Sequence, residues 1–250
     1  MPQLDPGEID YTALSFPDPP PDRPFVAINM VMSADGRTVI DGTERGLGSK
    51  LDQRLMRELR VHFDVVMNGG ATFRASGTSA RLNDPGLEQW RLDRGMTPSP
   101  IAAVLTRSGD LPPERRFFTD DGFEAVIYLS SAAPDAVRRE LETRGRPVVS
   151  VQEGSEAVAA LAHTKGELGA SRVLVEGGAT LNGDLMRHGL VDEYFLTLAP
   201  RIAGGESAHP AVQWPGEPTA EGIRQLSLVH AITAGNGEAF LRYRLQRSHS

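Results

Sequence analysis

The sequence predicts an α/β fold in three layers, with helices on both faces of a mostly parallel mixed sheet and an antiparallel hairpin at the C-terminus. Short apolar runs alternate with amphipathic runs through most of the 250 residues, which is typical of parallel strands joined by covering helices. Near the end of the chain, two alternating runs meet at Gly235–Asn236–Gly237, a favoured hairpin turn. We find no boundary after residue 24 and expect one domain, 25–250, preceded by a Pro-rich arm, 1–24.

Composition narrows the class of protein. Lys and Arg number 26 and Asp and Glu number 33, so the net charge of −7 argues against nucleic-acid and membrane-surface partners. The chain has no cysteine, which excludes disulfides, thiolate metal sites and Cys nucleophiles. The six histidines show no ligand spacing, so we expect no metal. No apolar run reaches the length of a membrane span and the N-terminus lacks the features of a signal peptide, so we expect a cytoplasmic protein.

The first third of the chain contains an arm, two strands and a helix. Five prolines between 17 and 24 forbid regular helix in the arm, which we expect to lie over the domain or over a partner subunit. The apolar run 25–33 predicts the first strand. Leucines recur at helical spacing after Ser49, a residue suited to cap a helix, and the buried strand 64–68 follows.

The remaining elements follow from the same patterns. The polar stretch 76–100 is expected to be irregular. After it, the sequence predicts strands 101–106 and 123–130, helix 134–145, strand 146–151, helix 155–169, strand 172–178, helix 180–189, strand 190–205 and the hairpin 223–246.

Two strand-to-helix junctions carry paired glycines. In NGGAT, Gly69 and Gly70 follow a strand that is expected to be buried, and Thr72 can cap a helix or bind a phosphate oxygen. In VEGGAT, Gly177 and Gly178 repeat the pattern. Either junction can be a plain turn, but the N–H groups at a helix start also suit a phosphate. Neither matches the dinucleotide fingerprint GxGxxG or an ATPase phosphate loop.

Polar side chains accompany these turns. Glu176 lies where the strand before VEGGAT ends, which is where ligands of open α/β sheets bind. Ser33 and Asp35 lie in the turn SADGR at the end of the first strand, where Asp35 could equally bond its own backbone. Together the three strand ends predict a cleft for a dinucleotide and a polar substrate.

The series MSADGR, RxxxDVVMNGGATFR and RVLVEGGATLNGDLMRHGLVDEYFLTLAPRIAGG resembles the pyrimidine reductases of riboflavin biosynthesis, from Pro24 to the C-terminus. That family includes the reductase half of the bifunctional deaminase–reductase and has a dihydrofolate reductase-like fold. Many bacterial members carry Lys where this chain has Asn29, whereas archaeal-type members, which act before deamination, have Asn. ASGTS stands in place of the family's Asp-Asp-Pro after the first glycine turn. The chain is most similar to stand-alone actinobacterial-type members.

The resemblance implies an NADPH-dependent oxidoreductase that reduces a ribosylamino-pyrimidine 5′-phosphate to its ribitylamino form. It assigns cofactor binding to Thr72, to Thr106, and to the turn and helix start formed by Gly178, Ala179, Thr180, Leu181, Asn182 and Gly183. The turn patterns add Gly69, Gly70 and Gly177 to the expected cofactor site. It assigns the substrate to Asn29, Ser33, Arg60, Arg81 and Glu176.

The expected mechanism is hydride transfer to C1′ of the open-chain imine. Arg60 and Arg81 would hold the phosphate and Glu176 the pyrimidine. Asp35 or a bound water would supply the proton, so Asp35 and Glu176 are the catalytic candidates. Two alternatives stay open: a reductase of dihydrofolate or another pterin, and a non-catalytic NADPH-binding protein. The run LVDEYFLTLAP is apolar enough to suggest a buried partner, and the family that the chain resembles commonly forms homodimers, so we expect a homodimer.

Overall fold

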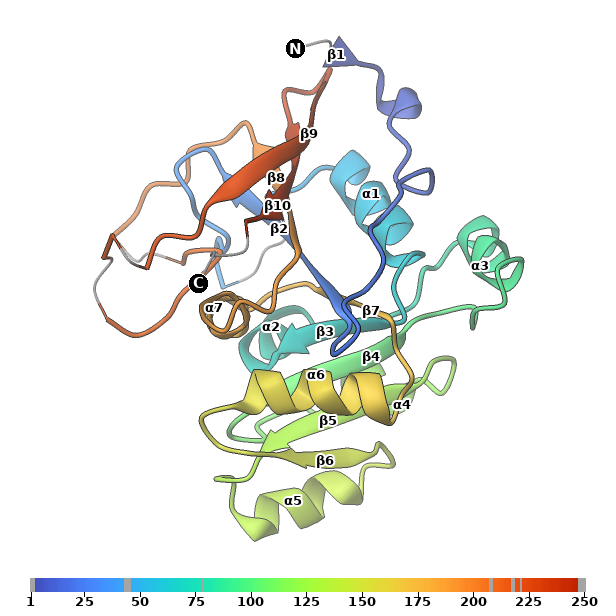
Figure 1. The fold of residues 1–250 in the computed structure, drawn as a ribbon, viewed down its shortest axis with the longest axis vertical. Helices are drawn as coiled ribbons and strands as arrows, with labels where there is room; N and C mark the ends of the chain where they lie inside the picture. The colour runs from blue at the N-terminus through green and yellow to red at the C-terminus, as the bar shows by residue number, and fades with distance from the viewer. Residues whose placement is uncertain are drawn as a thin grey trace.

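The structure, a computed structural model, describes residues 3–42, 46–77, 79–206, 209–216, 219–220 and 222–246. Within them the chain forms one ten-stranded mixed sheet in the order β1-β9-β10-β8-β2-β7-β3-β4-β5-β6 (Figure 1). The strands are β1 Gln3–Leu4, β2 Phe25–Ser33, β3 Val65–Gly69, β4 Ile101–Thr106, β5 Ala125–Ser130, β6 Val148–Val151, β7 Arg172–Val175, β8 Glu193–Ala199, β9 Leu226–Ala234 and β10 Ala239–Leu245.

Seven neighbouring strands, from β8 to β6, run parallel, whereas β10 is antiparallel to both β8 and β9. The hairpin turns at Gly235–Asn236–Gly237, where Asn236 accepts a hydrogen bond from the Glu238 amide. The expected parallel sheet with a C-terminal antiparallel hairpin is therefore confirmed.

Helices cover both faces of the sheet, so the structure has three layers. Their bounds are α1 Lys50–Arg60, α2 Gly70–Ser76, α3 Pro85–Leu92, α4 Arg116–Thr119, α5 Asp135–Glu142, α6 Glu156–Gly166 and α7 Ala179–Arg187, with a 3-10 turn at Pro6–Glu8. Alternation along the strands divides the core: Phe25 and Ala27 of β2 pack on the face of α1, whereas Val26 and Ile28 pack on the face of α6 and α7. Figure 1 shows α6 on this second face, in front of β4 and β5 and running alongside them.

One helix of the structure, α3, lies in the stretch that we expected to be irregular. The Asp84 carboxylate accepts hydrogen bonds from the amides of Gly86 and Leu87, and Pro85 occupies the first helical position. Asp-Pro-Gly is typical of turns, but Asp followed by Pro is also a helix start. The helix is then held by Arg91, which is fully buried and donates to backbone carbonyls of the segment after α1.

The arm lies over the domain, one of the two expectations for it. Its first strand, β1, pairs with β9, and Ile9 and Tyr11 are buried. The Tyr11 amide donates to the Glu58 carboxylate at 3.0 Å, and Arg54 donates to the Ile9 carbonyl at 2.9 Å. These contacts attach the arm to α1. The division into an arm, 1–24, and a domain, 25–250, stays a prediction.

Candidate active site

Neighbouring parallel strands bring three polar residues into one row. Ile28, Val175 and Met67 lie level with one another across β2, β7 and β3. The residues that follow them are Asn29, Glu176 and Asn68. Because side chains alternate along a strand, all three point to the face that α1 covers. The hydrogen bond from the Glu176 amide to the Met67 carbonyl, 3.0 Å long, continues this alignment past the end of β7.

Glu176 is paired with Arg60 of α1. Arg60 Nε donates to Oε1 at 2.7 Å and Nη2 donates to Oε2 at 2.6 Å, which is the two-bond geometry of the strongest arginine–carboxylate pairs. The side chains are 11% and 10% exposed. Burial disfavours the charge of the guanidinium, but its attraction to Glu176 prevails and raises the pKa of Arg60. The pair is therefore a fixed ionic element of the site.

The remaining donors of Arg60 are directed at backbone. Nη1 donates to the carbonyls of Ser79 and Arg81, at 3.1 and 3.3 Å. With Nε and Nη2 bound to Glu176, most of the guanidinium is already engaged. The structure thus brings Arg60 and Glu176 together, but it favours a role for Arg60 in holding Glu176 over the expected role in binding phosphate.

The two glycine turns touch each other beside this pair. The Gly69 amide donates to the Gly177 carbonyl at 2.8 Å. A methyl group on Gly69 would lie 3.2 Å from the Gly178 nitrogen, which is backbone and has little freedom to move. Gly177 has φ of +85°, a conformation that favours glycine. The close approach of the two turns therefore requires glycine on both sides.

The two threonines lie against the same corner. Thr72 Oγ1 would be 3.2 Å from a methyl group on Gly178, and Thr106 Oγ1 would be 3.1 Å from one on Gly70. Thr106 is buried, and its hydroxyl accepts a hydrogen bond from the Gly109 amide. Six of the expected cofactor contacts thus converge: both glycine pairs, Thr72 and Thr106.

Helices α2 and α7 both begin at this corner. Their N-cap residues, Gly69 and Gly178, supply no capping side chain, and neither first turn contains an acidic residue. Such N–H groups carry partial positive charge and can donate to an anion. Ala179 and Thr180 lie in the first turn of α7, and Thr180 is exposed. The corner offers a surface of backbone donors for a phosphate.

Three expected cofactor residues lie instead on the buried side of α7. Leu181 packs in the core, and Asn182 is fully buried with its side-chain amide donating to the Ala211 carbonyl at 2.7 Å. A methyl group on Gly183 would lie 1.9 Å from the Gln213 carbonyl oxygen. These contacts fit packing of α7 against 211–213, so the cofactor roles of these residues stay predictions that the geometry disfavours.

Ser33 is the last residue of β2, and Asp35 lies in the turn that follows. Ser33 is four residues beyond Asn29, which at about 3.3 Å a residue places it roughly 13 Å past the row of Glu176. Asp35 accepts hydrogen bonds from the Ser33 hydroxyl at 2.5 Å and from the amides of Ala203 and Gly204 at 3.1 and 2.8 Å.

These hydrogen bonds explain the state of the Asp35 carboxyl. The bond from Ser33, followed by those from Ala203 and Gly204, lowers the pKa of Asp35 far below its ordinary value. At neutral pH the group is an anion that fixes the loop around 203–204. A strongly stabilised carboxylate is a weak acid catalyst. The expected role of Asp35 as proton donor is thus a prediction that its surroundings disfavour.

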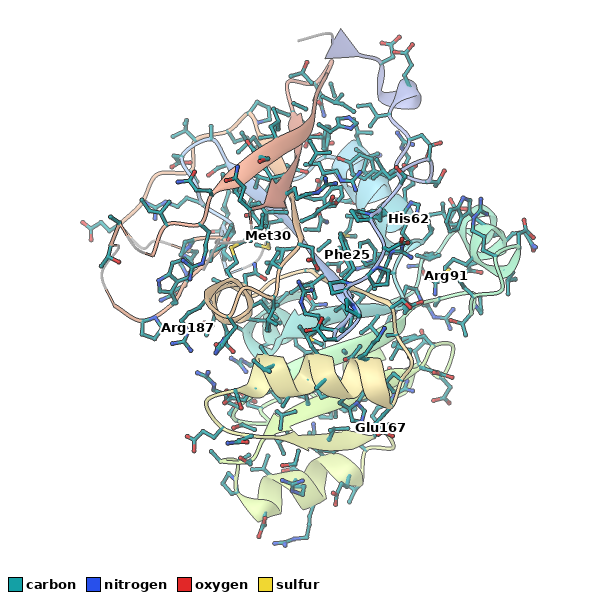
Figure 2. The ribbon with its side chains drawn as sticks, in the orientation of Figure 1. Phe25, Met30, His62, Arg91, Glu167 and Arg187 are labelled. Carbon is teal, nitrogen blue, oxygen red and sulfur yellow. The ribbon has the colours of Figure 1, made fainter. Side chains whose placement is uncertain are left out.

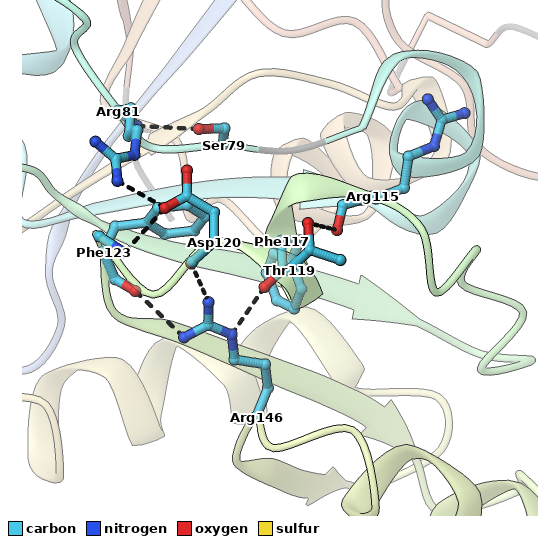
Figure 3. Close-up of polar contacts among 9 residues, drawn as sticks. Ser79, Arg81, Arg115, Phe117, Thr119, Asp120, Phe123 and Arg146 are labelled. Atoms are coloured by element: carbon cyan, nitrogen blue, oxygen red, sulfur yellow. Dashed lines mark hydrogen bonds and ion pairs between the residues drawn. The ribbon is translucent and has the colours of Figure 1, made fainter.

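The Arg81 side chain pairs with Asp120 and not with Glu176, and Figure 3 shows its guanidinium directed at the Asp120 carboxylate. Its guanidinium donates to Asp120 at 2.6 Å, and this bond raises the pKa of Arg81. Arg146 holds the same segment by donating to the carbonyls of Phe117, Asp120 and Phe123. Arg81 therefore contributes its backbone carbonyl to Arg60, whereas its side chain fastens the segment before β5.

Sequence reasoning did not name Asn68 or Met30 as site residues. Asn68 stands level with Glu176 and is buried, and the register of β3 with β7 is what identifies it. Met30 Sδ would be 3.4 Å from a methyl group on Gly177. Across the described ranges, no cluster of His, Asp and Glu could hold a metal ion, and no helix is long and apolar enough to cross a membrane.

Fold and site together define a three-layer α/β protein with a glycine-lined corner and a buried ion pair at the carboxyl edge of its sheet. Residues 24–240 match the model of the RibD C-terminal domain family. The chain belongs to that family.

Named relatives agree with this assignment. The chain is 32% identical over 214 residues to the 2,5-diamino-6-ribosylamino-4(3H)-pyrimidinone 5′-phosphate reductase of Methanothermobacter thermautotrophicus, covering 85% of this chain and 94% of that protein. The reductase of the same name from Archaeoglobus fulgidus is 29% identical, and the match covers 74% of this chain and 84% of that protein.

A solved structure shares the fold. A pyrimidine reductase-like protein of Corynebacterium diphtheriae superposes with a TM-score of 0.83 at 19% identity, over 98% of this chain and all of that protein. The family and fold class expected from the sequence are confirmed.

Proposed function

We propose that this protein reduces a ribosylamino-pyrimidine 5′-phosphate to its ribitylamino form with NADPH as reductant. The observation that carries the proposal is the junction of two bare glycine turns beside the Arg60–Glu176 pair. Together they offer a backbone cradle for a dinucleotide next to a carboxylate for a heterocycle. The substrate we favour is the 2,5-diamino-pyrimidinone, because two relatives carry that name and Asn29 lies level with Glu176.

The residues at the corner fit a dinucleotide. A methyl group on Gly69 would press on the Gly178 nitrogen, and one on Gly178 would press on the Thr72 hydroxyl, so bare backbone at these positions lets the two helix starts come together at one corner. Gly177, Ala179 and Thr180 would complete the cradle, with amide hydrogens of α7 directed at the phosphates and the Thr72 hydroxyl beside them. When bound, NADPH would supply a hydride to C1′ of the open-chain imine.

Glu176 would orient the substrate ring. A carboxylate can accept two parallel hydrogen bonds from adjacent N–H groups of a pyrimidine, and the two hydrogen bonds from Arg60 hold this carboxylate in one orientation. Asn29 and Asn68, level with Glu176 on the same face, would offer amide groups to the ring or the sugar. Since the Asp35 carboxylate is bound to Ser33 and two amides, a water molecule is the better source of the proton on nitrogen.

The test follows the fall of NADPH absorbance with the deaminated and non-deaminated pyrimidine phosphates as substrates. We expect turnover of the diamino form, and Glu176→Gln should lower its kcat/KM by about 100-fold by removing a charge-assisted contact. Arg139→Ala, an exposed change on α5, is the control. Turnover of dihydrofolate alone would replace this proposal with the pterin alternative, and NADPH binding without any oxidation would indicate a non-catalytic protein.

We also propose that the protein is a homodimer. The run LVDEYFLTLAP forms β8, which lies inside the sheet between β10 and β2, so its apolar side chains are buried within the chain itself. A better argument is the exposed apolar surface of β9 and the segment just before it, formed by Ile223, Leu226, Leu228 and Val229. Apolar groups gathered on one exposed strand are typical of a subunit interface.

A further inference from the structure

A cavity lies at the opposite edge of the sheet from the glycine turns. Its volume is about 410 Å³, within the range of small-molecule sites. Asp64 and Arg172 line it, and these residues stand where β3 and β7 begin, whereas the glycine turns stand where the same strands end. The arm and α3 form its walls, through Phe16 and Trp90.

Aromatic rings form one wall of this cavity. The His62 ring lies between those of Phe16 and Trp90, with centroids 5.1 and 5.0 Å away. His62 Nε2 bonds the Tyr11 carbonyl at 2.7 Å, so it carries the proton, and Nδ1 is left as an acceptor. Burial lowers the pKa of His62 to about 4, which keeps the ring neutral. The wall is therefore apolar with one acceptor.

Two arginines make the cavity cationic. Arg94 stacks on Trp90, with its central carbon 3.6 Å from the ring centroid. Arg172 lines the cavity and donates to the Pro17 carbonyl through Nη2, but its buried Nε has no partner among the described residues. A buried N–H without an acceptor is costly, so it favours a ligand that supplies one.

The one carboxylate in the described lining of the cavity, that of Asp64, is already hydrogen-bonded to backbone amides. Asp64 Oδ2 accepts hydrogen bonds from the amides of Ser171 and Arg172, at 2.8 and 2.9 Å. With His62 neutral, the two guanidinium groups outweigh this one carboxylate.

The cavity is also held in shape before any ligand binds. Arg91, next to Trp90 on α3, is fully buried and donates to the carbonyls of Val61 and Phe63 at 3.0 and 2.7 Å. These bonds fix α3 to the segment that carries His62 (Figure 2). A preformed site spares a ligand the entropy of ordering it.

We propose that this cavity is a binding site for a planar heteroaromatic ligand with one anionic group. The ring would lie against Phe16, His62 and Trp90, and the anion would accept from Arg172 Nε with Arg94 nearby. The site is separate from the glycine turns, so this proposal does not depend on the proposed reduction.

The experiment uses the full chain and three probes: adenosine 5′-monophosphate, adenosine and ribose 5-phosphate, titrated by calorimetry with saturating NADP⁺ present. We expect adenosine 5′-monophosphate to bind one to one, about tenfold or more tighter than either fragment. Arg172→Gln and Trp90→Leu should each weaken it about tenfold, and so should Arg94→Ala, an exposed change that leaves the core intact. Arg139→Ala on α5 should not.

The proposal is overturned by the absence of saturable binding. It is also overturned if NADP⁺ abolishes binding, which would place the probe at the glycine turns, or if Arg172→Gln and Arg94→Ala both leave the affinity unchanged. If adenosine binds as tightly as adenosine 5′-monophosphate, the cavity does not recognise an anionic group and the proposal is wrong.

Discussion

The guanidinium of Arg60 and the carboxylate of Glu176 face each other between α1 and the end of β7, joined by hydrogen bonds of 2.7 and 2.6 Å. Both are nearly enclosed by protein. Removing one member of such a pair leaves the other buried and uncompensated, which costs about 3–5 kcal/mol in comparable cases. The pair therefore links the stability of the fold to the geometry of the site.

Arg60→Ala separates two roles for this arginine. If Arg60 holds Glu176, kcat/KM falls by about 100-fold with the phosphorylated substrate and by the same factor with its dephosphorylated form, because the lost contact concerns the ring. If Arg60 binds phosphate, the loss is confined to the phosphorylated substrate. Steady-state kinetics on both substrates decides. Arg57→Ala, one turn earlier on α1, is the matched control and should leave both rates unchanged.

Gly69→Ala tests the contact between the two turns. A methyl group here meets the Gly178 nitrogen at 3.2 Å, so the turns must separate. We expect NADPH affinity to fall by about tenfold or more, together with a loss of about 1–3 kcal/mol in unfolding free energy. Gly166→Ala at the end of α6 meets nothing within 4 Å and should be neutral or slightly stabilising. Unchanged NADPH affinity in Gly69→Ala would remove this corner from the cofactor site.

Local pattern was enough to predict the sheet, most helices and the glycine turns. Alternation along β2, β7 and β3 is a local property, and parallel strands end at one edge, so both glycine turns were expected at one cleft. The direct contact of Gly69 with Gly177 depends on β3 and β7 being neighbours, which chain order leaves open. The prediction of an irregular stretch at 76–100 missed α3, because Asp-Pro-Gly suits a turn as well as a helix start and the burial of Arg91 depends on distant contacts.

The sequence alone could not predict which side chains pair when they lie far apart along the chain. Arg60 and Arg81 look alike as phosphate ligands, but one pairs with Glu176 and the other with Asp120, 39 residues away along the chain. Leu181, Asn182 and Gly183 follow a cofactor turn in sequence, but the rotation of α7 turns them to the core. The distance of Ser33 from Glu176 depends on strand register, which pattern alone leaves open.

Asp52 should make stability fall as pH rises. Burial, with Glu238 nearby, raises its pKa from 3.8 to about 6 although a bond from Thr197 opposes this. The folded protein then binds this proton more tightly than the unfolded chain, so the contribution to stability is complete below about pH 4 and is lost as pH rises through 6. Above pH 6, the unfolding free energy of Asp52→Asn should exceed that of the wild type by about 1–2 kcal/mol, a figure reduced to account for screening by solvent.

Urea unfolding at a series of pH values measures this difference. His62 offers a companion of opposite sign, because burial lowers its pKa from 6.5 to about 4 and its contribution is lost as pH falls. The unfolding free energy of His62→Phe should therefore rise relative to that of the wild type as pH falls from about 6.5 to 4. A difference between Asp52→Asn and wild type that stays constant from pH 4 to 7 would contradict the assignment to Asp52.

Leu228→Lys tests the proposed subunit interface on β9. Leu228 is 54% exposed on a strand whose first four residues are all exposed, and Val229 and Leu226 beside it are 43% and 38% exposed. A charge placed in the core of an apolar interface must be desolvated, so we expect the dimer to weaken by about 100-fold or more. Sedimentation velocity at micromolar concentration should show a dimer for the wild type and a monomer for the variant. Val158→Lys, at an exposed apolar position on α6, should remain dimeric, and a wild type that sediments as a monomer would end the proposal.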